Sequence, residues 1–202
     1  MDRANSYTSH RMNEIAGTLT EKNLMTAFTL ESQAIQKYTW FAKVAGKEGF
    51  KQMEAIFLET AEQKKSHCKT LFRFLEGCEV ELTIKLQAGP ISTTLEILLL
   101  SARAEEQQSQ QLFAEFESTA WDEGFKKAAS KLKLFRQIKQ FYADRFTALA
   151  KNIQNEEVFR KDKKVKWICR KCGLIYESER ALKNCPGCEH PEAYFEVLAG
   201  NY

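Results

Sequence analysis

The sequence predicts a mainly α-helical protein in which a four-helix bundle with a long crossover connection precedes a small metal domain with four cysteines. Three observations predict this class. Apolar residues recur at three- and four-residue spacing along four segments, as on one face of a helix. A segment with Gly and Pro, 77–93, separates the first two of these from the last two. Four of the six cysteines fall within the last 34 residues.

Bulk composition limits the classes of partner. The 202 residues are enough for a sizeable core, and 44% hydrophobic with 28% charged residues is ordinary for a globular protein. A net charge of +3, with no basic run containing interleaved aromatics, gives no reason to expect nucleic acid. The richest apolar run, 95–100, is too short to cross a bilayer, so we expect no membrane partner.

The N-terminal residues contain no apolar segment of the kind found in a secretory signal. Clustered cysteines indicate a metal site rather than disulfides, so their number does not imply an oxidising compartment. We therefore expect a cytoplasmic protein.

The first pair of elements follows a polar segment without periodicity, residues 1–18, which predicts a flexible tail. Thr20 is a plausible N-cap for a helix that runs to about Ala45. The stretch "GKEGF" at 46–50 interrupts the pattern, and a second helix then runs to about Leu75. The apolar face of this second helix contains two polar residues, Lys64 and His67.

The second pair of elements follows the crossover. Apolar stripes over 95–116 and 132–149 predict two more helices. Between them, "WDEGFKK" at 121–127 repeats "GKEGFKQ" at 46–52 with an offset of 75 residues. Two similar helical hairpins joined by a long connection indicate a duplicated four-helix bundle over 19–154.

The same offset relates the polar positions of the two hairpins. It maps Lys64 onto Lys139 and His67 onto Tyr142. The two hairpins therefore place lysines at matching positions on their apolar faces.

The C-terminal part has a different composition. Residues 155–166 form a charged linker, and 167–202 form a second domain too short to fold on its own hydrophobic core. Two Cys-x2-Cys pairs, separated by twelve residues, supply four thiolates for a tetrahedral site that suits iron or zinc. Cys68 and Cys78 lie outside this pattern.

Two stretches of the C-terminal domain, "WICRKCGLIYES" and "NCPGCEHPEAYFEVL", resemble the rubredoxin-type domain of rubrerythrins. The resemblance implies one iron that alternates between the ferrous and ferric states, with zinc as an alternative occupant in recombinant protein. The implied metal ligands are Cys169, Cys172, Cys185 and Cys188.

The bundle is also similar to rubrerythrin, in "GTLTEKNLMTAFTLESQA", "FLETAEQKKSHCKTLFRFLEG" and "AKNIQNEEVFRKD", so the resemblance covers nearly all of 17–198. It implies a ferritin-like bundle whose di-iron centre reduces hydrogen peroxide. Electrons would arrive through the rubredoxin-type iron, usually across a dimer. The implied partners are a second copy of the chain and an electron-donating reductase or other redox protein.

Position by position, the chain keeps only part of the family's di-iron ligand set. Three of the seven positions match, and four are substituted. The matching residues are Glu31, His67 and Glu105; the substituted ones are Lys64, Gln108, Lys139 and Tyr142. In this resemblance Lys64 and Lys139 stand where glutamates bridge the two irons.

Lysine is a poor substitute for a metal ligand. At about 4 Å and an effective dielectric of about 20, each pair of like unit charges repels by about 4 kcal/mol. Two lysines and two glutamates on facing stripes neutralise each other without metal. We therefore hypothesise a metal-free cluster of Glu31, Lys64, Glu105 and Lys139, in which Gln108, His67 and Tyr142 complete hydrogen bonds.

Several alternatives remain open from sequence alone. The lysines could extend to the surface and leave lone glutamates. Glu31, His67 and Glu105 could bind a single metal. A buried lysine could serve as a Schiff-base amine, although no substrate pocket is visible.

The corresponding functions are a one-electron carrier, a non-catalytic interaction protein of the family, or an active peroxidase. The last of these requires the di-iron ligands that are substituted here.

Overall fold

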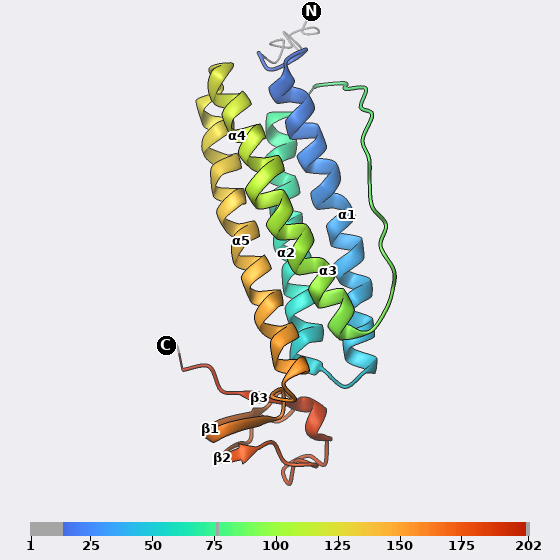
Figure 1. Cartoon of the computed structure of the whole chain (residues 1–202), viewed down its shortest axis with the longest axis vertical. Helices are drawn as coiled ribbons and strands as arrows, with labels where there is room; N and C mark the ends of the chain where they lie inside the picture. The colour runs from blue at the N-terminus through green and yellow to red at the C-terminus, as the bar shows by residue number, and fades with distance from the viewer. Residues whose placement is uncertain (1–13, 76, 201–202) are drawn as a thin grey trace, which may run out of the picture.

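The computed structural model describes residues 14–75 and 77–200, where a helical bundle stands on a small β-sheet domain (Figure 1). The bundle comprises α1 (Leu19–Lys47), α2 (Lys51–Phe74), α3 (Thr94–Gln107), the π-helical turn η1 (Gln108–Leu112), α4 (Phe113–Asp122) and α5 (Lys126–Gln154). Because α3, η1 and α4 follow one another without a break, they form one long helical rod. The predicted mainly α-helical bundle is confirmed.

The crossover connection determines how the helices run. Residues 77–93 pass along the outside of the bundle beside α1, from the end where α2 finishes to the end where α3 begins (Figure 1). As a result α2 and α3 run in the same direction, although each belongs to an antiparallel hairpin. This is the long crossover that the sequence predicts.

The first helix starts two residues earlier than its predicted cap. Thr18 is the N-cap, and its Oγ1 accepts from the Glu21 backbone N–H at 3.1 Å. The prediction of Thr20 as N-cap is wrong because Thr20 is buried inside the helix and its hydroxyl donates to Glu123 at 2.6 Å. The predicted tail, 1–18, lies mostly outside the described residues; within its last part Ile15 is buried.

The duplication is visible in how the helices are capped. Thr93 caps α3 as Thr18 caps α1, at the same offset of 75 residues. The Glu123 carboxylate accepts from the Thr20 N–H at the start of α1 (2.8 Å), and the Glu48 carboxylate accepts from the Thr94 N–H at the start of α3 (2.9 Å). Each hairpin turn therefore caps the first helix of the other hairpin.

The C-terminal domain is a three-stranded antiparallel sheet with strand order β2-β1-β3. It comprises β1 (Arg160–Cys169), β2 (Ile175–Arg180), the 3-10 turn η2 (Glu192–Tyr194) and β3 (Phe195–Val197). The segment expected as a linker, 155–166, is therefore strand from Arg160 onward. Most of its charged residues are exposed, and the strand pairs with β2.

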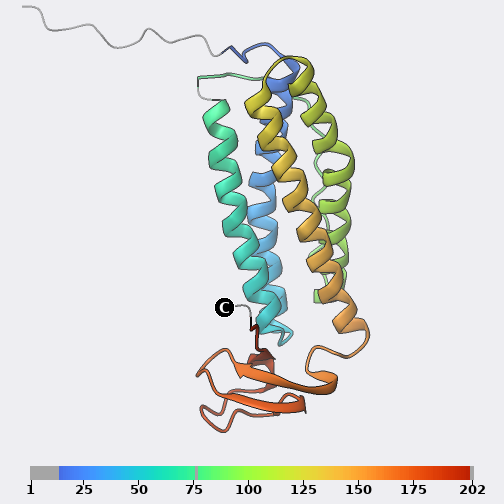
Figure 2. The ribbon, with the colours of Figure 1, turned by 90° about the vertical axis from the view of Figure 1, so that its left-hand side faces the viewer.

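The small domain lies against the end of the bundle that carries the α1–α2 turn (Figure 2). The Phe50 ring stacks on Phe159, with centroids 6.3 Å apart. Near it, the Lys51 ammonium lies 5.7 Å from the centroid of the Tyr194 ring. Aromatic and cation–π contacts thus join the two domains.

The bundle core consists of two apolar clusters. One lies nearer the small domain and contains Tyr38, Phe57 and Phe146; the other contains Leu24, Leu71, Phe113 and Leu132. Each helical rod contributes to both clusters, and between its two contributions each rod carries one buried charged residue. These four residues are Glu31, Lys64, Glu105 and Lys139.

Candidate metal centre and buried lysine–glutamate cluster

The four C-terminal cysteines meet at one point. Cys169 ends β1 and the other three lie in the two loops that face it. Their sulfurs all lie within 4.8 Å of one another, with Cys169 and Cys188 at 3.8 Å and Cys172 and Cys185 at 3.5 Å. A tetrahedral ion with metal–sulfur bonds of about 2.3 Å would place sulfurs about 3.8 Å apart. The residues therefore fit a four-thiolate metal ion.

Backbone groups and neighbouring thiols act in opposite directions on the sulfurs. The N–H groups of Leu174, Gly187 and His190 hydrogen-bond to cysteine sulfurs and stabilise their charged form. Hydrogen bonds among the cysteines raise the pKa of Cys172 and Cys188, whereas the pKa of Cys185 is lowered to about 7. The Gly187 backbone lies close to the Cys172 sulfur, and a Cβ there would be 3.4 Å from it.

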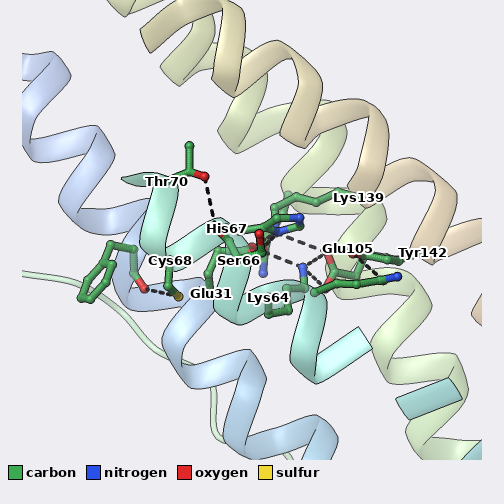
Figure 3. Close-up of polar contacts among 12 residues, drawn as sticks. Glu31, Lys64, Ser66, His67, Cys68, Thr70, Glu105, Lys139 and Tyr142 are labelled. Carbon is green, nitrogen blue, oxygen red and sulfur yellow. Dashed lines mark hydrogen bonds and ion pairs between the residues drawn. The ribbon is translucent and has the colours of Figure 1, made fainter. Parts of the chain in front are cut away.

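The second site is the buried cluster at the middle of the bundle, where side chains from all four rods converge (Figure 3). The Lys64 ammonium lies 2.7 Å from Glu105 Oε1 and 3.3 Å from Glu31 Oε1. The Lys139 ammonium lies 3.2 Å from Glu105 Oε2 and also contacts Glu31 Oε1. Each lysine thus bridges both carboxylates.

The two lysines of the cluster are buried. Lys64 is 0% exposed and Lys139 is 1% exposed. The alternative in which the lysines extend to the surface is therefore wrong. Both lysines also lie over aromatic rings, Lys64 at 4.8 Å from the Tyr142 centroid and Lys139 at 4.4 Å from the Phe113 centroid.

The pKa values in the cluster indicate charged groups. Burial by itself would raise the pKa of Glu31, but Lys139, Lys64 and His67 hold it well below its usual range. The pKa of Glu105 is likewise lowered, because both lysines outweigh its burial. Burial would lower the pKa of Lys64, yet Glu105 and Glu31 raise it. The carboxylates are therefore ionised and Lys64 is protonated.

Two of the remaining ligand-position residues bond directly to the cluster. His67 Nδ1 lies 2.8 Å from Glu31 Oε2, and Gln108 Oε1 accepts from Lys139 at 2.8 Å. The third, Tyr142, does not make the expected hydrogen bond to the cluster. Its hydroxyl donates to Gln63 at 3.0 Å, and it is the ring that faces Lys64.

Sequence reasoning missed one member of the cluster. The Tyr38 hydroxyl donates to Glu105 Oε1 at 2.5 Å. Its place on the Glu31 stripe, seven residues further along α1, was the available signal. With Tyr38, Glu105 accepts hydrogen bonds from three donors.

The π-helical turn η1 starts at Gln108, directly beside the cluster. Glu31 and Glu105 are 74 residues apart, whereas Phe41 and Phe116, beyond the turn, are 75 apart. A π turn adds one residue to a helix and is frequent at functional sites, and here it lies between the pair related by 74 residues and the pair related by 75.

A single metal held by Glu31, His67 and Glu105 is not favoured by the geometry. Across residues 14–75 and 77–200, the four cysteines form the only group of three or more His, Cys, Asp or Glu ligand atoms within 4.8 Å of one another. In the bundle, ammonium groups occupy the space between the carboxylates. In the same described ranges, no helix is long and apolar enough to span a bilayer.

Comparisons with known proteins match both the bundle and the four-cysteine domain. The rubrerythrin family model matches residues 22–149, and the model for the rubredoxin-like domain of rubrerythrin matches 167–196. Nigerythrin in its mixed-valence state has the same fold, with a TM-score of 0.59 and 26% identity over 96% of this chain and 90% of that one.

Curated relatives are more similar in sequence. Rubrerythrin of Porphyromonas gingivalis is 44% identical over 93% of this chain and 94% of its own length. Rubrerythrin of Nitratidesulfovibrio vulgaris is 39% identical over 95% of this chain and all of its own length. With a four-cysteine site of rubredoxin type following a helical bundle, the chain belongs to the rubrerythrin family.

Proposed function

We propose that this chain is a one-electron redox protein that uses the iron of its four-cysteine site, and that the centre of its bundle holds no metal. The observation that carries the proposal is the position of Lys64 and Lys139. Each ammonium contacts both Glu31 and Glu105, the two carboxylates that remain of the family's ligand set.

Iron bound to the four cysteines supplies one-electron chemistry. The four thiolates would hold the ion, and the N–H groups that face them would stabilise their negative charge. Cys172 is exposed, whereas Cys169 and Cys185 are buried. An electron partner would therefore approach the site on the Cys172 side.

The residues at the centre of the bundle do not suit the family's peroxide chemistry. That chemistry needs two irons, and both positions implied to bridge them are occupied by buried lysines. Two ammoniums and two carboxylates already balance in charge, so an added dication would be repelled and would leave the network unbalanced. Loss of the di-iron centre removes the site at which peroxide would be reduced.

The proposed partners follow from the family. We propose a homodimer that receives electrons from a reductase or another redox protein in the cytoplasm. The rival function is a non-catalytic family member whose four-cysteine site holds zinc.

Visible spectroscopy and peroxide kinetics test the proposal on the purified full chain. We expect a red protein that bleaches on reduction and is reoxidised by hydrogen peroxide no faster than a small rubredoxin-type protein. Cys172→Ser should lose the colour, and Cys78→Ser, outside the site, should keep it. Catalytic reoxidation by peroxide would contradict the proposal, and a colourless zinc protein would favour the rival.

A further inference from the structure

A small cavity lies beside the lysine–glutamate cluster, between the crossover connection and helices α1 and α3. Its volume is about 80 Å³. We call it the Lys37 cavity; among the residues that line it are Lys37, Ser101, Glu105 and Gln108 from the helices and Gly89 and Pro90 from the crossover. Since one water takes up about 30 Å³, the cavity has room for about two or three waters or one ligand of three or four heavy atoms.

The charge around the Lys37 cavity is positive. Lys37 is half-buried, and in the described part of the chain no carboxylate lies within ion-pair distance of its ammonium. Burial lowers the pKa of Lys37, and Glu105 offsets part of that effect. If the cluster is metal-free, as under the proposed function, its two lysines and two glutamates cancel. Lys37 then leaves one positive charge without a counter-ion.

Glu105 does not provide that counter-ion at close range. Its carboxylate lines the cavity, but its oxygens accept from Tyr38, Lys64 and Lys139. These three donors take up the hydrogen-bond-accepting capacity of the Glu105 carboxylate within the cluster.

One buried hydrogen-bond donor at the cavity has no partner in the described residues. The Ser101 hydroxyl is buried and has no hydrogen-bond partner. Buried polar groups in native proteins are nearly always paired, so this hydroxyl indicates a missing acceptor. Gln108, which is half-buried, uses its Oε1 to accept from Lys139, so its amide N–H₂ points away from that bond.

A larger groove of about 690 Å³ adjoins the cavity. The groove shares Lys37, Gln87 and Gln108 with the cavity, and adds Lys85 and Glu115. We expect a small solute to enter from this groove, along the crossover connection.

We propose that the Lys37 cavity binds a small monovalent oxyanion, of the size of formate or nitrate, with Lys37 as its counter-ion and Gln108 and Ser101 as hydrogen-bond donors. The anion restores charge neutrality beside the cluster and supplies the acceptor that the Ser101 hydroxyl lacks.

Titration with sodium formate tests this proposal in the full-length iron-loaded chain, at constant ionic strength set with sodium chloride. The side-chain amide signals of Gln108 and Gln87 are followed by ¹H–¹⁵N NMR. We expect saturable shifts with half-saturation at about 1 mM or weaker, the limit for a three-atom ligand. Lys37→Gln should weaken binding by about tenfold or more, and Ser101→Ala by less.

Lys43→Gln is the matched control, because Lys43 is an exposed lysine on the same helix, α1. It should bind formate as the unsubstituted chain does. Shifts that stay linear, or that persist in Lys37→Gln, would overturn the proposal, as would a cavity that responds to no anion and holds water alone. The iron content of the same sample is measured in parallel, so a failed metal-free cluster would be distinguished from a failed anion site.

Discussion

At the scale of single residues, the main feature of the bundle is a pair of buried lysines at its centre. A buried ion pair contributes little net stability, but removing one partner leaves the other charge without compensation. Lys64 and Lys139 face two carboxylates in a sealed core, so each lysine is required once the carboxylates are present.

Replacing Lys64 with methionine tests this requirement. We expect Lys64→Met to lower the free energy of unfolding by about 3–5 kcal/mol, because Glu31 and Glu105 lose a shared cation. Lys65→Met is the adjacent control: its exposed pair with Glu62 should be worth less than about 1 kcal/mol. Urea unfolding measures both, and equal losses would contradict the account.

The cluster also predicts how stability depends on pH. The pKa values of Glu31 and Glu105 are lowered from 4.5, so their contribution is present above that value and is lost as pH falls through the lowered pKa. The pKa of Lys64 is raised from 10.5, so its contribution is present below that value and is lost as pH rises through the raised pKa.

We therefore expect the free energy of unfolding, from urea titrations followed by far-UV circular dichroism, to be nearly constant between about pH 6 and 9 and to fall in acid. Glu31→Gln should reduce the acid-dependent part. A free energy that increases from pH 5 to pH 3 would show that the carboxylates are not held ionised.

Sequence reasoning identified the residues on the apolar stripes but not all of their contacts. Glu31, Lys64, Glu105 and Lys139 could be predicted to meet because helical periodicity places each on an inward face. Tyr38 could not be assigned to the cluster, since an aromatic residue on such a face usually only packs.

At the scale of elements, the hairpin turns cap helices of the opposite hairpin. Glu48 and Glu123 accept from N–H groups at the starts of α3 and α1, where otherwise unpaired donors and the helix dipole favour a carboxylate. These contacts join the two hairpins at both ends of the bundle.

Removing these caps should destabilise the bundle. Glu48→Ala and Glu123→Ala should each lower the free energy of unfolding by about 0.5–2 kcal/mol. Glu106→Ala, at an exposed position near the end of α3, where the helical rod continues into η1, should change it by less than about 0.5 kcal/mol. If all three substitutions had the same effect in urea titrations, the capping role would be disproved.

Local sequence signals predicted which helices form better than they predicted where each helix or strand begins and ends. Both Thr18 and Thr20 are suitable N-caps, and the choice depends on Glu123, which is distant in sequence. The strand from Arg160 was missed because its charged residues resemble a linker. Its structure comes from pairing with β2, which no local pattern shows.

At the scale of the whole molecule, the duplicated bundle follows from an internal repeat, and the small domain follows from its cysteine spacing. The contact between the bundle and the small domain could not be predicted from the sequence, because it joins Phe50 and Phe159, which are more than a hundred residues apart. The sequence also could not predict that the crossover lines the Lys37 cavity, since residues 77–93 have no periodic pattern.

Restoring the family's ligand set tests whether the bundle retains the geometry of a di-iron protein. The variant carries Lys64→Glu, Gln108→Glu, Lys139→Glu and Tyr142→His. Because it exchanges two ammoniums for carboxylates, we expect its iron content to rise from about one to about three per chain. Lys65→Glu, a control at an exposed site, should leave the iron content at about one per chain. If the iron content of the restored variant also stayed at about one, a di-iron site would need more than these four substitutions.

The most direct test of the central claim is the location and number of iron atoms in the unsubstituted protein, by metal analysis and anomalous scattering from one crystal. The account predicts about one iron per chain, at the four cysteines, and a lysine–glutamate network without anomalous signal at the centre of the bundle. About three irons per chain, with anomalous density between Glu31 and Glu105, would contradict it.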